Sequence, residues 1–109
     1  MNVFKKILAG QIPCKKVLEN EHFLCFHDIA PQAKVHVLVI SKRSLRDFNA
    51  CDGELLAHLP SFVHQVVEIL GIKESGYKLL TNTGIDGGQE VPHLHFHILG
   101  GERIKSRFN

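Results

Sequence analysis

Residues 91–101 read VPHLHFHILGG, a stretch in which histidine alternates with a bulky apolar residue before two glycines. Successive side chains of a β-strand point to opposite faces, so the alternation predicts a strand with two unlike faces. One face carries His93, His95 and His97, and the other carries Leu94, Phe96 and Ile98. We place Pro92 at the first residue of the strand, where proline is tolerated. The apolar face is expected to cover a core, which leaves the histidine row as the candidate functional surface.

Further strands are predicted by segments rich in β-branched and aromatic residues, at residues 15–20, 22–28, 34–40 and 77–82. Short polar connections between neighbouring segments favour hairpins. Two helical segments accompany these strands. The arrangement predicts an α+β domain built on an antiparallel sheet.

The two helical segments begin at good capping residues. Asn2 can cap a short helix, and Asp52 can cap a long one whose apolar stripe is expected to cover the sheet. Pro60 falls inside the long run, where it removes a backbone hydrogen bond. A kink or a break is therefore expected near Leu59.

The length and composition limit the classes of function. With 109 residues the chain is expected to form one domain over residues 1–109, in which 102–109 is a short C-terminal tail. The 13 basic residues nearly balance the 11 acidic ones and are scattered, which argues against a nucleic-acid partner. No apolar run has the length of a membrane span, and no secretory leader is visible, so we expect no membrane partner and a cytoplasmic location. The three cysteines form no C-x-x-C pair, which argues against a disulfide framework or a cysteine zinc site.

A row of three imidazoles can serve three purposes. It can be the polar, solvent-facing side of a half-buried strand. It can bind a metal ion, since two histidines at i and i+2 can reach one ion while further ligands come from elsewhere. It can also act on phosphorus, because a neutral imidazole is a good nucleophile near pH 7. For the last role, one ring nitrogen of the central His95 must donate to a fixed acceptor so that the other presents its lone pair.

Several other residues are candidates for the site only if they lie close to this histidine row. Gly87 and Gly88 allow a loop to offer backbone N–H groups to an anion, and Asn82 at the end of its strand could contact phosphate. Asp28 could accept the two hydroxyls of a ribose or cap its own turn. His36 could be a core residue or a neighbour of the histidine row.

The HLHFHIL motif followed by two glycines resembles the signature of the histidine triad (HIT) nucleotide-binding proteins. FHDIAPQAKVHVLVI and TNTGIDGGQEVPHLHFHILGG are similar to the Hint branch of that family, in register from about Val3 to Gly101. The resemblance implies an α+β fold with a five-stranded antiparallel sheet, one long helix and one short helix. Two copies would form a homodimer with a continuous ten-stranded sheet.

The resemblance also implies an enzyme that binds a purine nucleotide such as AMP, GMP or an adenosine-like ligand. It would hydrolyse nucleoside phosphoramidates (AMP-amine or AMP-lysine conjugates) or acyl-adenylates through a nucleotidyl-histidine intermediate, with no cofactor and no metal. His95 matches the nucleophile, His93 and His97 match its flanking partners, and His36 matches the fourth histidine of the cluster. Asp28 matches the ribose carboxylate. The phosphate-side matches are Asn82, Gly88, Gln89, Glu90 and Val91, and the matches to the base pocket are Phe4, Ile7, Ile12, His27, Ile29 and Leu38.

The sequence departs from the family pattern at three places. Glu90 stands where animal relatives have a serine near the leaving group, Pro92 replaces an aromatic residue, and the short tail ERIKSRFN has no tryptophan. Three other functions stay open on the sequence. They are hydrolysis of dinucleoside polyphosphates by the same histidines, a nucleotide-responsive interaction protein with little turnover, and a zinc-binding module.

Overall fold

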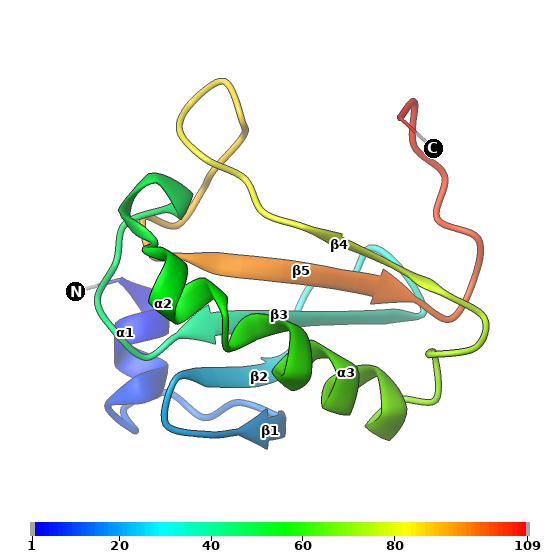
Figure 1. Ribbon diagram of the computed structural model, residues 1–109, viewed down its shortest axis with the longest axis horizontal. Helices are drawn as coiled ribbons and strands as arrows, with labels where there is room; N and C mark the ends of the chain where they lie inside the picture. The colour runs from blue at the N-terminus through cyan, green and yellow to red at the C-terminus, as the bar shows by residue number, and fades with distance from the viewer. Residues whose placement is uncertain (1, 109) are drawn as a thin grey trace.

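The computed structural model describes residues 2–108, so Met1 and Asn109, the ends of the predicted domain, lie outside the described residues. In chain order the elements are α1 (Val3–Leu8), β1 (Lys16–Glu19), β2 (Phe23–His27), β3 (Val35–Ser41), the 3₁₀ helix η1 (Phe48–Ala50), α2 (Gly53–Leu56), α3 (Leu59–Ile69), β4 (Tyr77–Leu80) and β5 (His95–Gly100). The strands form one sheet in the order β1-β2-β3-β5-β4, and every neighbouring pair is antiparallel (Figure 1). The predicted α+β fold on a five-stranded antiparallel sheet is confirmed.

The larger core lies between the sheet and α3, which crosses one face of the sheet (Figure 1). Phe62, Val63, Val66 and Val67 of α3 are buried there. The sheet contributes Phe23, Cys25, Val37, Val39, Phe96 and Ile98 to the same cluster. The long helical segment therefore covers the apolar face of β5, as the alternating pattern predicts.

The helical run after Asp52 is interrupted, which confirms the break expected near Leu59. Asp52 caps α2 by accepting a hydrogen bond from the backbone N–H of Leu55 at 2.8 Å. Pro60 stands in the first turn of α3, where its missing N–H has no intrahelical partner to lose. Within residues 2–108 the structure therefore has three α-helices, because the expected long helix is divided into α2 and α3 at this break. Ile69, the last residue of α3, is 57% exposed, so the apolar stripe expected to cover the sheet ends before it.

A smaller core covers the opposite face of the sheet, beneath α1. The side chain of Asn2 caps α1 by accepting from the N–H of Lys5 at 2.9 Å. Phe4 from this helix packs with Leu24, Phe26, Leu38 and Ile40 of β2 and β3. The cap predicted at Asn2 is confirmed, and it fixes the helix that brings Phe4 to the histidine side.

Strand β5 begins at His95, so the placement of Pro92 at its first residue is wrong. The neighbouring strand β3 ends at Ser41, and the last pair of the ladder is Ile40 with His95. Beyond that pair the chain bends, although the N–H of Ser41 still donates to the carbonyl of Leu94. His93 therefore precedes the strand and lies in the bend. Across the described residues 2–108, no helix has the length and apolar character needed to cross a bilayer.

Candidate active site

The strand register brings the histidines of two strands to one face of the sheet. Leu38 lies opposite His97 and Ile40 lies opposite His95, so His36 on β3 shares the face of the β5 histidines. The ring of Phe4 meets the ring of His95 edge-on, with centroids 4.9 Å apart. It meets the ring of His93 in the same way at 6.0 Å. The predicted histidine row thus lies on the α1 side, against an aromatic wall.

The ring of His95 is held in one tautomer by the backbone. Its Nδ1 lies 2.6 Å from the carbonyl oxygen of His93. A carbonyl only accepts, so Nδ1 carries the proton and Nε2 presents its lone pair. Burial lowers the pKa of His95 below its ordinary value of 6.5, and the hydrogen bond to His93 opposes this. Near pH 7 the ring is therefore neutral, as a nitrogen nucleophile must be.

His93 anchors the carbonyl that fixes His95. Its Nε2 donates to the carbonyl oxygen of Ser41 at 2.7 Å, so its proton is on Nε2. Its Nδ1 is buried and has no hydrogen-bond partner within residues 2–108. The pKa of His93 is lowered mainly by burial. His93 therefore acts on His95 through its backbone, while its own ring is locked in the interior.

A second chain of hydrogen bonds fixes His36 and His97. The backbone N–H of Gln32 donates to Nδ1 of His36 at 3.0 Å, so the proton of His36 is on Nε2. This Nε2 donates to Nδ1 of His97 at 2.9 Å, which leaves the proton of His97 on its own Nε2. Burial, followed by the nearby His95 and His36, lowers the pKa of His97 to about 4. At pH 7 His97 is therefore neutral and can donate a hydrogen bond from Nε2. It does not carry the second proton that a general acid would transfer.

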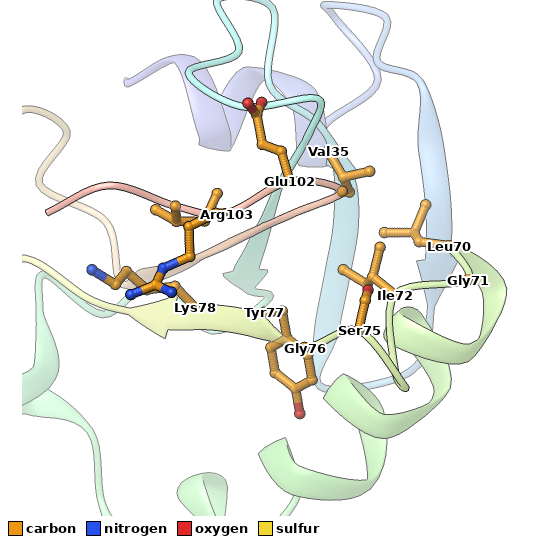
Figure 2. A pocket seen from close by; sticks show the side chains of 12 residues that line it. Val35, Leu70, Gly71, Ile72, Ser75, Gly76, Tyr77, Lys78, Glu102 and Arg103 are labelled. Atoms are coloured by element: carbon orange, nitrogen blue, oxygen red, sulfur yellow. The ribbon is translucent and has the colours of Figure 1, made fainter. Parts of the chain in front are cut away.

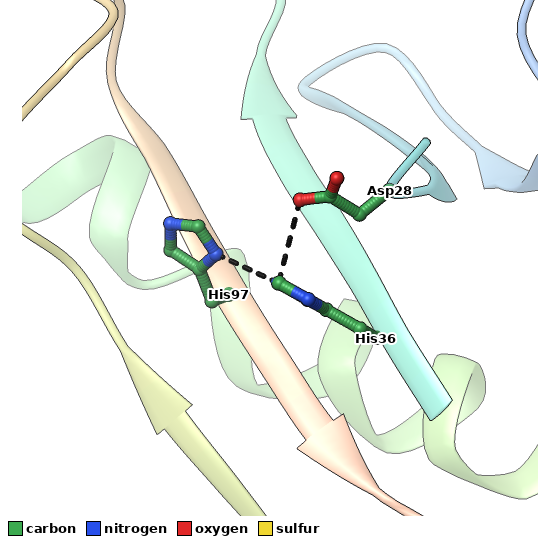
Figure 3. Close-up of side chains that lie close together, drawn as sticks. All are labelled: Asp28, His36 and His97. Carbon is green, nitrogen blue, oxygen red and sulfur yellow. Dashed lines mark hydrogen bonds and ion pairs between the residues drawn. The ribbon is translucent and has the colours of Figure 1, made fainter. Parts of the chain in front are cut away.

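Asp28 completes this cluster, which we call the histidine relay: His36, His93, His95, His97 and Asp28. One oxygen of Asp28 lies 3.5 Å from Nε2 of His36, as Figure 3 shows. The ligand atoms of Asp28, His36 and His97 all lie within 4.8 Å of one another, a spacing that could also hold a metal ion. However, Nε2 of His36 already carries a proton that it donates to His97. The donor set therefore fits a hydrogen-bonded chain better than a metal centre.

A cavity of about 750 Å³ opens beside the relay. Four predicted residues line it, His27, Asp28, Ile29 and His36, together with Pro13, Cys14, Lys15, Pro31 and Lys34. Of the other residues matched to the base pocket, Phe4 and Leu38 are buried in the small core, and Ile7 and Ile12 are partly buried. Ile29 is fully exposed. The cavity has the size of a small-molecule site, with a carboxylate at its boundary with the relay.

The predicted phosphate loop is braced by its own amides. The side chain of Asn82 donates to the carbonyl of Gly87 at 2.6 Å. Gln89 accepts from the N–H of Gly84 at 3.0 Å and donates to the carbonyls of Arg46 and Val91. Asn82 and Gln89 therefore hold the shape of the loop in this structure.

At two positions of that loop, Gly87 and Gly88, a residue with a side chain would be sterically unfavourable. A side-chain carbon on Gly87 would lie 2.3 Å from the carbonyl oxygen of Thr83, and Gly88 has a φ of +75°, which favours glycine. Glu90 is exposed, and Val91 packs against the small core. In this structure the N–H groups of Gly88 and Gln89 donate to the carbonyls of Ile85 and Gly84, each at 3.0 Å, so both are used within the loop.

A second cavity, of about 760 Å³, lies away from the histidines, where the ends of β4 and β5 meet the turn after α3 (Figure 2). Tyr77, Lys78, Glu102 and Arg103 are among its lining residues. No predicted site residue belongs to the described lining. Of the two cavities, the first is the one with relay residues in its lining, His36 and Asp28, whereas His93, His95 and His97 are not among its lining residues.

Three contacts in the site involve residues that the sequence did not single out. They are the N–H of Gln32 on His36, the carbonyl of Ser41 on His93, and the hydroxyl of Thr81, which donates to the carbonyl of His95 at 2.7 Å. Two of these groups belong to the backbone, which every residue has, so they leave no signal in the sequence. Thr81 follows Leu80, the partner of His97 in β4, so a correct register would have found it.

Comparisons of the sequence and of the structure with known proteins all identify HIT proteins. The HIT domain family matches residues 9–104. An HIT-like protein of Helicobacter pylori is 64% identical over 103 residues, which cover 94% of this chain and 99% of that protein. The structure of a histidine triad protein from Clostridium difficile matches with a TM-score of 0.89 at 34% identity, over 95% of this chain and 93% of that chain. A HIT family hydrolase from Legionella pneumophila matches with a TM-score of 0.90 at 38% identity, over 96% of each chain. The chain belongs to the HIT domain family.

Proposed function

We propose that this protein hydrolyses purine nucleoside phosphoramidates, such as AMP-amine and AMP-lysine conjugates, or acyl-adenylates. The HIT family generally acts on nucleotides, and a structural neighbour is described as a hydrolase. One observation carries the proposal: Nδ1 of His95 donates to the carbonyl of His93, so the other nitrogen of this neutral ring is available as a nucleophile.

The proposed reaction has two displacements at the α-phosphorus. First, Nε2 of His95 forms a bond to phosphorus while the bond from phosphorus to the amine breaks, and the amine leaves with a proton taken from solvent. Then the oxygen of water bonds to phosphorus as the bond to His95 breaks, and the proton of that water returns to solvent. The products are the free amine and the nucleoside monophosphate, and His95 is regenerated.

The neighbours of His95 have separate roles in this scheme. His97 uses its Nε2–H to stabilise the charge on a phosphoryl oxygen. Asp28 accepts the ribose hydroxyls at the cavity, and the loop around Gly88 receives the phosphate when its N–H groups exchange their bonds within the loop for bonds to the phosphate. The purine base lies in the cavity, next to His27, Ile29 and the segment around Ile12. No metal or cofactor takes part.

The test is to trap the intermediate. The protein is mixed with an adenosine phosphoramidate, quenched within milliseconds, and mapped by mass spectrometry for a nucleotide on the His95 ring. His95→Ala should lose activity by roughly 10⁴-fold or more, because the attacking atom is gone. His64→Ala, a change of an exposed histidine on α3, is the matched control and should keep full activity. A nucleotide on another residue, or full turnover by His95→Ala, contradicts the proposal.

The leaving group distinguishes this activity from its closest alternative, hydrolysis of dinucleoside polyphosphates. Glu90 is an exposed carboxylate at the position matched to the leaving-group side. Its charge favours a cationic or neutral amine over a polyphosphate. Comparing turnover of the phosphoramidate with that of a diadenosine polyphosphate separates the two. Binding of nucleotide with turnover of neither would favour an interaction protein.

We further propose that the active form is a homodimer located in the cytoplasm. The edge strand β4 exposes two large apolar side chains, with Tyr77 37% and Leu79 43% exposed. Pairing of two such edges would join the sheets into one of ten strands. The three free cysteines suit a reducing compartment. The mass in solution, measured by light scattering, tests the dimer.

A further inference from the structure

The carboxylate of Asp28 faces both the cavity and the histidine relay. Its Oδ1 accepts a hydrogen bond from the backbone N–H of Ala30 at 2.8 Å, which fixes the carboxylate in its own turn. Its Oδ2 lies 3.5 Å from Nε2 of His36, and the side chain is 18% exposed. Figure 3 shows this oxygen and Nδ1 of His97 meeting the same end of the His36 ring. A group bound in the cavity can therefore contact a carboxylate that already contacts the relay.

The charge of this carboxylate also acts on the rings beyond His36. Burial lowers the pKa of both His95 and His97, and Asp28 opposes that effect at each of them. The other titratable groups near these rings are His36 and His93, and Lys5 lowers the pKa of His93. Asp28 thus favours positive charge on the rings. The proposed intermediate needs such support, because a His95 ring bonded to phosphorus at Nε2 and protonated at Nδ1 is a cation.

We propose that Asp28 is a positioning residue for the histidine relay as well as a ribose contact. Its Oδ2 lies beside the Nε2–H that His36 donates to His97 and so orients the His36 ring, and its charge stabilises the positive charge on the nucleotidyl form of His95. This inference rests on the proposed function and deepens it. A ribose contact acts only when the ribose hydroxyls are present, whereas support of the relay acts on every substrate. The two roles can therefore be separated by experiment.

The experiment compares two substrates on two proteins. The substrates are an adenosine phosphoramidate and its 2′,3′-dideoxy analogue, and the proteins are the unchanged chain and Asp28→Asn. Asparagine has nearly the same shape and keeps an acceptor for the N–H of Ala30, so it removes mainly the charge. We expect Asp28→Asn to lower kcat for both substrates by roughly 10- to 100-fold, as for outer carboxylates that orient a working imidazole.

The dideoxy substrate decides between the two roles. If Asp28 only binds ribose, Asp28→Asn will raise KM for the ribose substrate and leave the kinetics of the dideoxy substrate unchanged, and the proposal is then overturned. Asp28→Glu keeps the charge and should give a kcat between those of the other two proteins. Glu74→Gln removes an exposed carboxylate from the turn before β4 and should behave as the unchanged chain does.

A second measurement needs no turnover. Removal of the carboxylate should lower the pKa of His95, so its ¹⁵N NMR titration should move to lower pH in Asp28→Asn. A titration that does not move counts against the proposal. If the unchanged chain turns over neither substrate, the proposed function fails, and the NMR titration still decides whether Asp28 acts on the relay.

Discussion

The two faces of this sheet are built from the same strands and serve different ends. On the α3 side the buried side chains form one continuous apolar cluster, centred on Phe62 and Phe96. On the α1 side the apolar cluster around Phe4 is smaller, and it adjoins the buried imidazoles of His36, His93 and His95. Buried polar rings lower stability unless every nitrogen is paired, and Nδ1 of His93 has no partner within residues 2–108. The comparison indicates that the apolar core on the α3 side supplies most of the folding stability. The buried histidines on the α1 side lower that stability and are held in fixed positions for the reaction.

The largest expected effect on stability lies on the α3 side. Phe62 is fully buried and touches Phe23 with ring centroids 5.5 Å apart. Phe62→Ala should lower the free energy of unfolding by about 3–5 kcal/mol, because it leaves a cavity in the larger core. Urea unfolding measures this loss, and kcat measured on the folded fraction should not change.

Phe48→Ala is the matched control, because Phe48 is 41% exposed and its removal should have a small effect. A fall in kcat for Phe62→Ala that exceeds its loss of folded protein would show that the two faces are not separate in function.

The next largest effect is a dependence of folding stability on pH, which arises from the buried histidines on the α1 side. His97 has a pKa of about 4 when folded and an ordinary value of 6.5. As pH falls from 6.5 toward 4, the unfolded chain binds a proton at His97 that the folded chain does not. The contribution of His97 to stability therefore decreases over that window and is constant above it. The lowered pKa values of His93 and His95 act in the same direction. Urea midpoints between pH 7.5 and pH 5 measure the slope.

His97→Asn sharpens this prediction. The side-chain oxygen of asparagine can accept from His36 as Nδ1 of His97 does, but it does not titrate. The slope of stability against pH should therefore be shallower in His97→Asn. Equal slopes in the two proteins would place the pH dependence elsewhere in the chain.

The smallest effect compares two helix caps on opposite sides of the sheet. Asn2→Ala and Asp52→Ala each remove a cap, of α1 and α2 respectively, and each should lower the free energy of unfolding by about 0.5–2 kcal/mol. Only α1 carries Phe4, which contacts the ring of His95. Nucleotide KM should therefore rise in Asn2→Ala and not in Asp52→Ala. Equal KM values in both variants would mean that α1 does not support the site.

Much of the fold could be predicted because its signals are local. The cap at Asn2, the break before Pro60 and the two-faced β5 all follow from the preferences of single residues or their immediate neighbours. The start of β5 was wrongly predicted because β5 can begin only where its antiparallel partner β3 still offers backbone groups to pair with. The alternating pattern continues through His93, but β3 does not continue beyond Ser41 to pair with it.

The candidate site was predicted in two ways. Alternation alone put His93, His95 and His97 in one row, whereas the resemblance to the HIT proteins added His36 and Asp28, and the structure places all five side chains close together. The sequence could not predict the partners that fix their protons, because the N–H of Gln32 and the carbonyl of Ser41 are backbone groups with no sequence signature.

The sequence by itself determined which side chains lie on each face of β5, because alternation is a property of the extended chain. Only the tertiary structure decided which nitrogen of each ring carries a proton. His36 and His97 are 61 positions apart in the chain, and His93 and Ser41 are 52 apart. A tautomer depends on whether a donor or an acceptor faces the ring, and at those separations only folding brings such a group there.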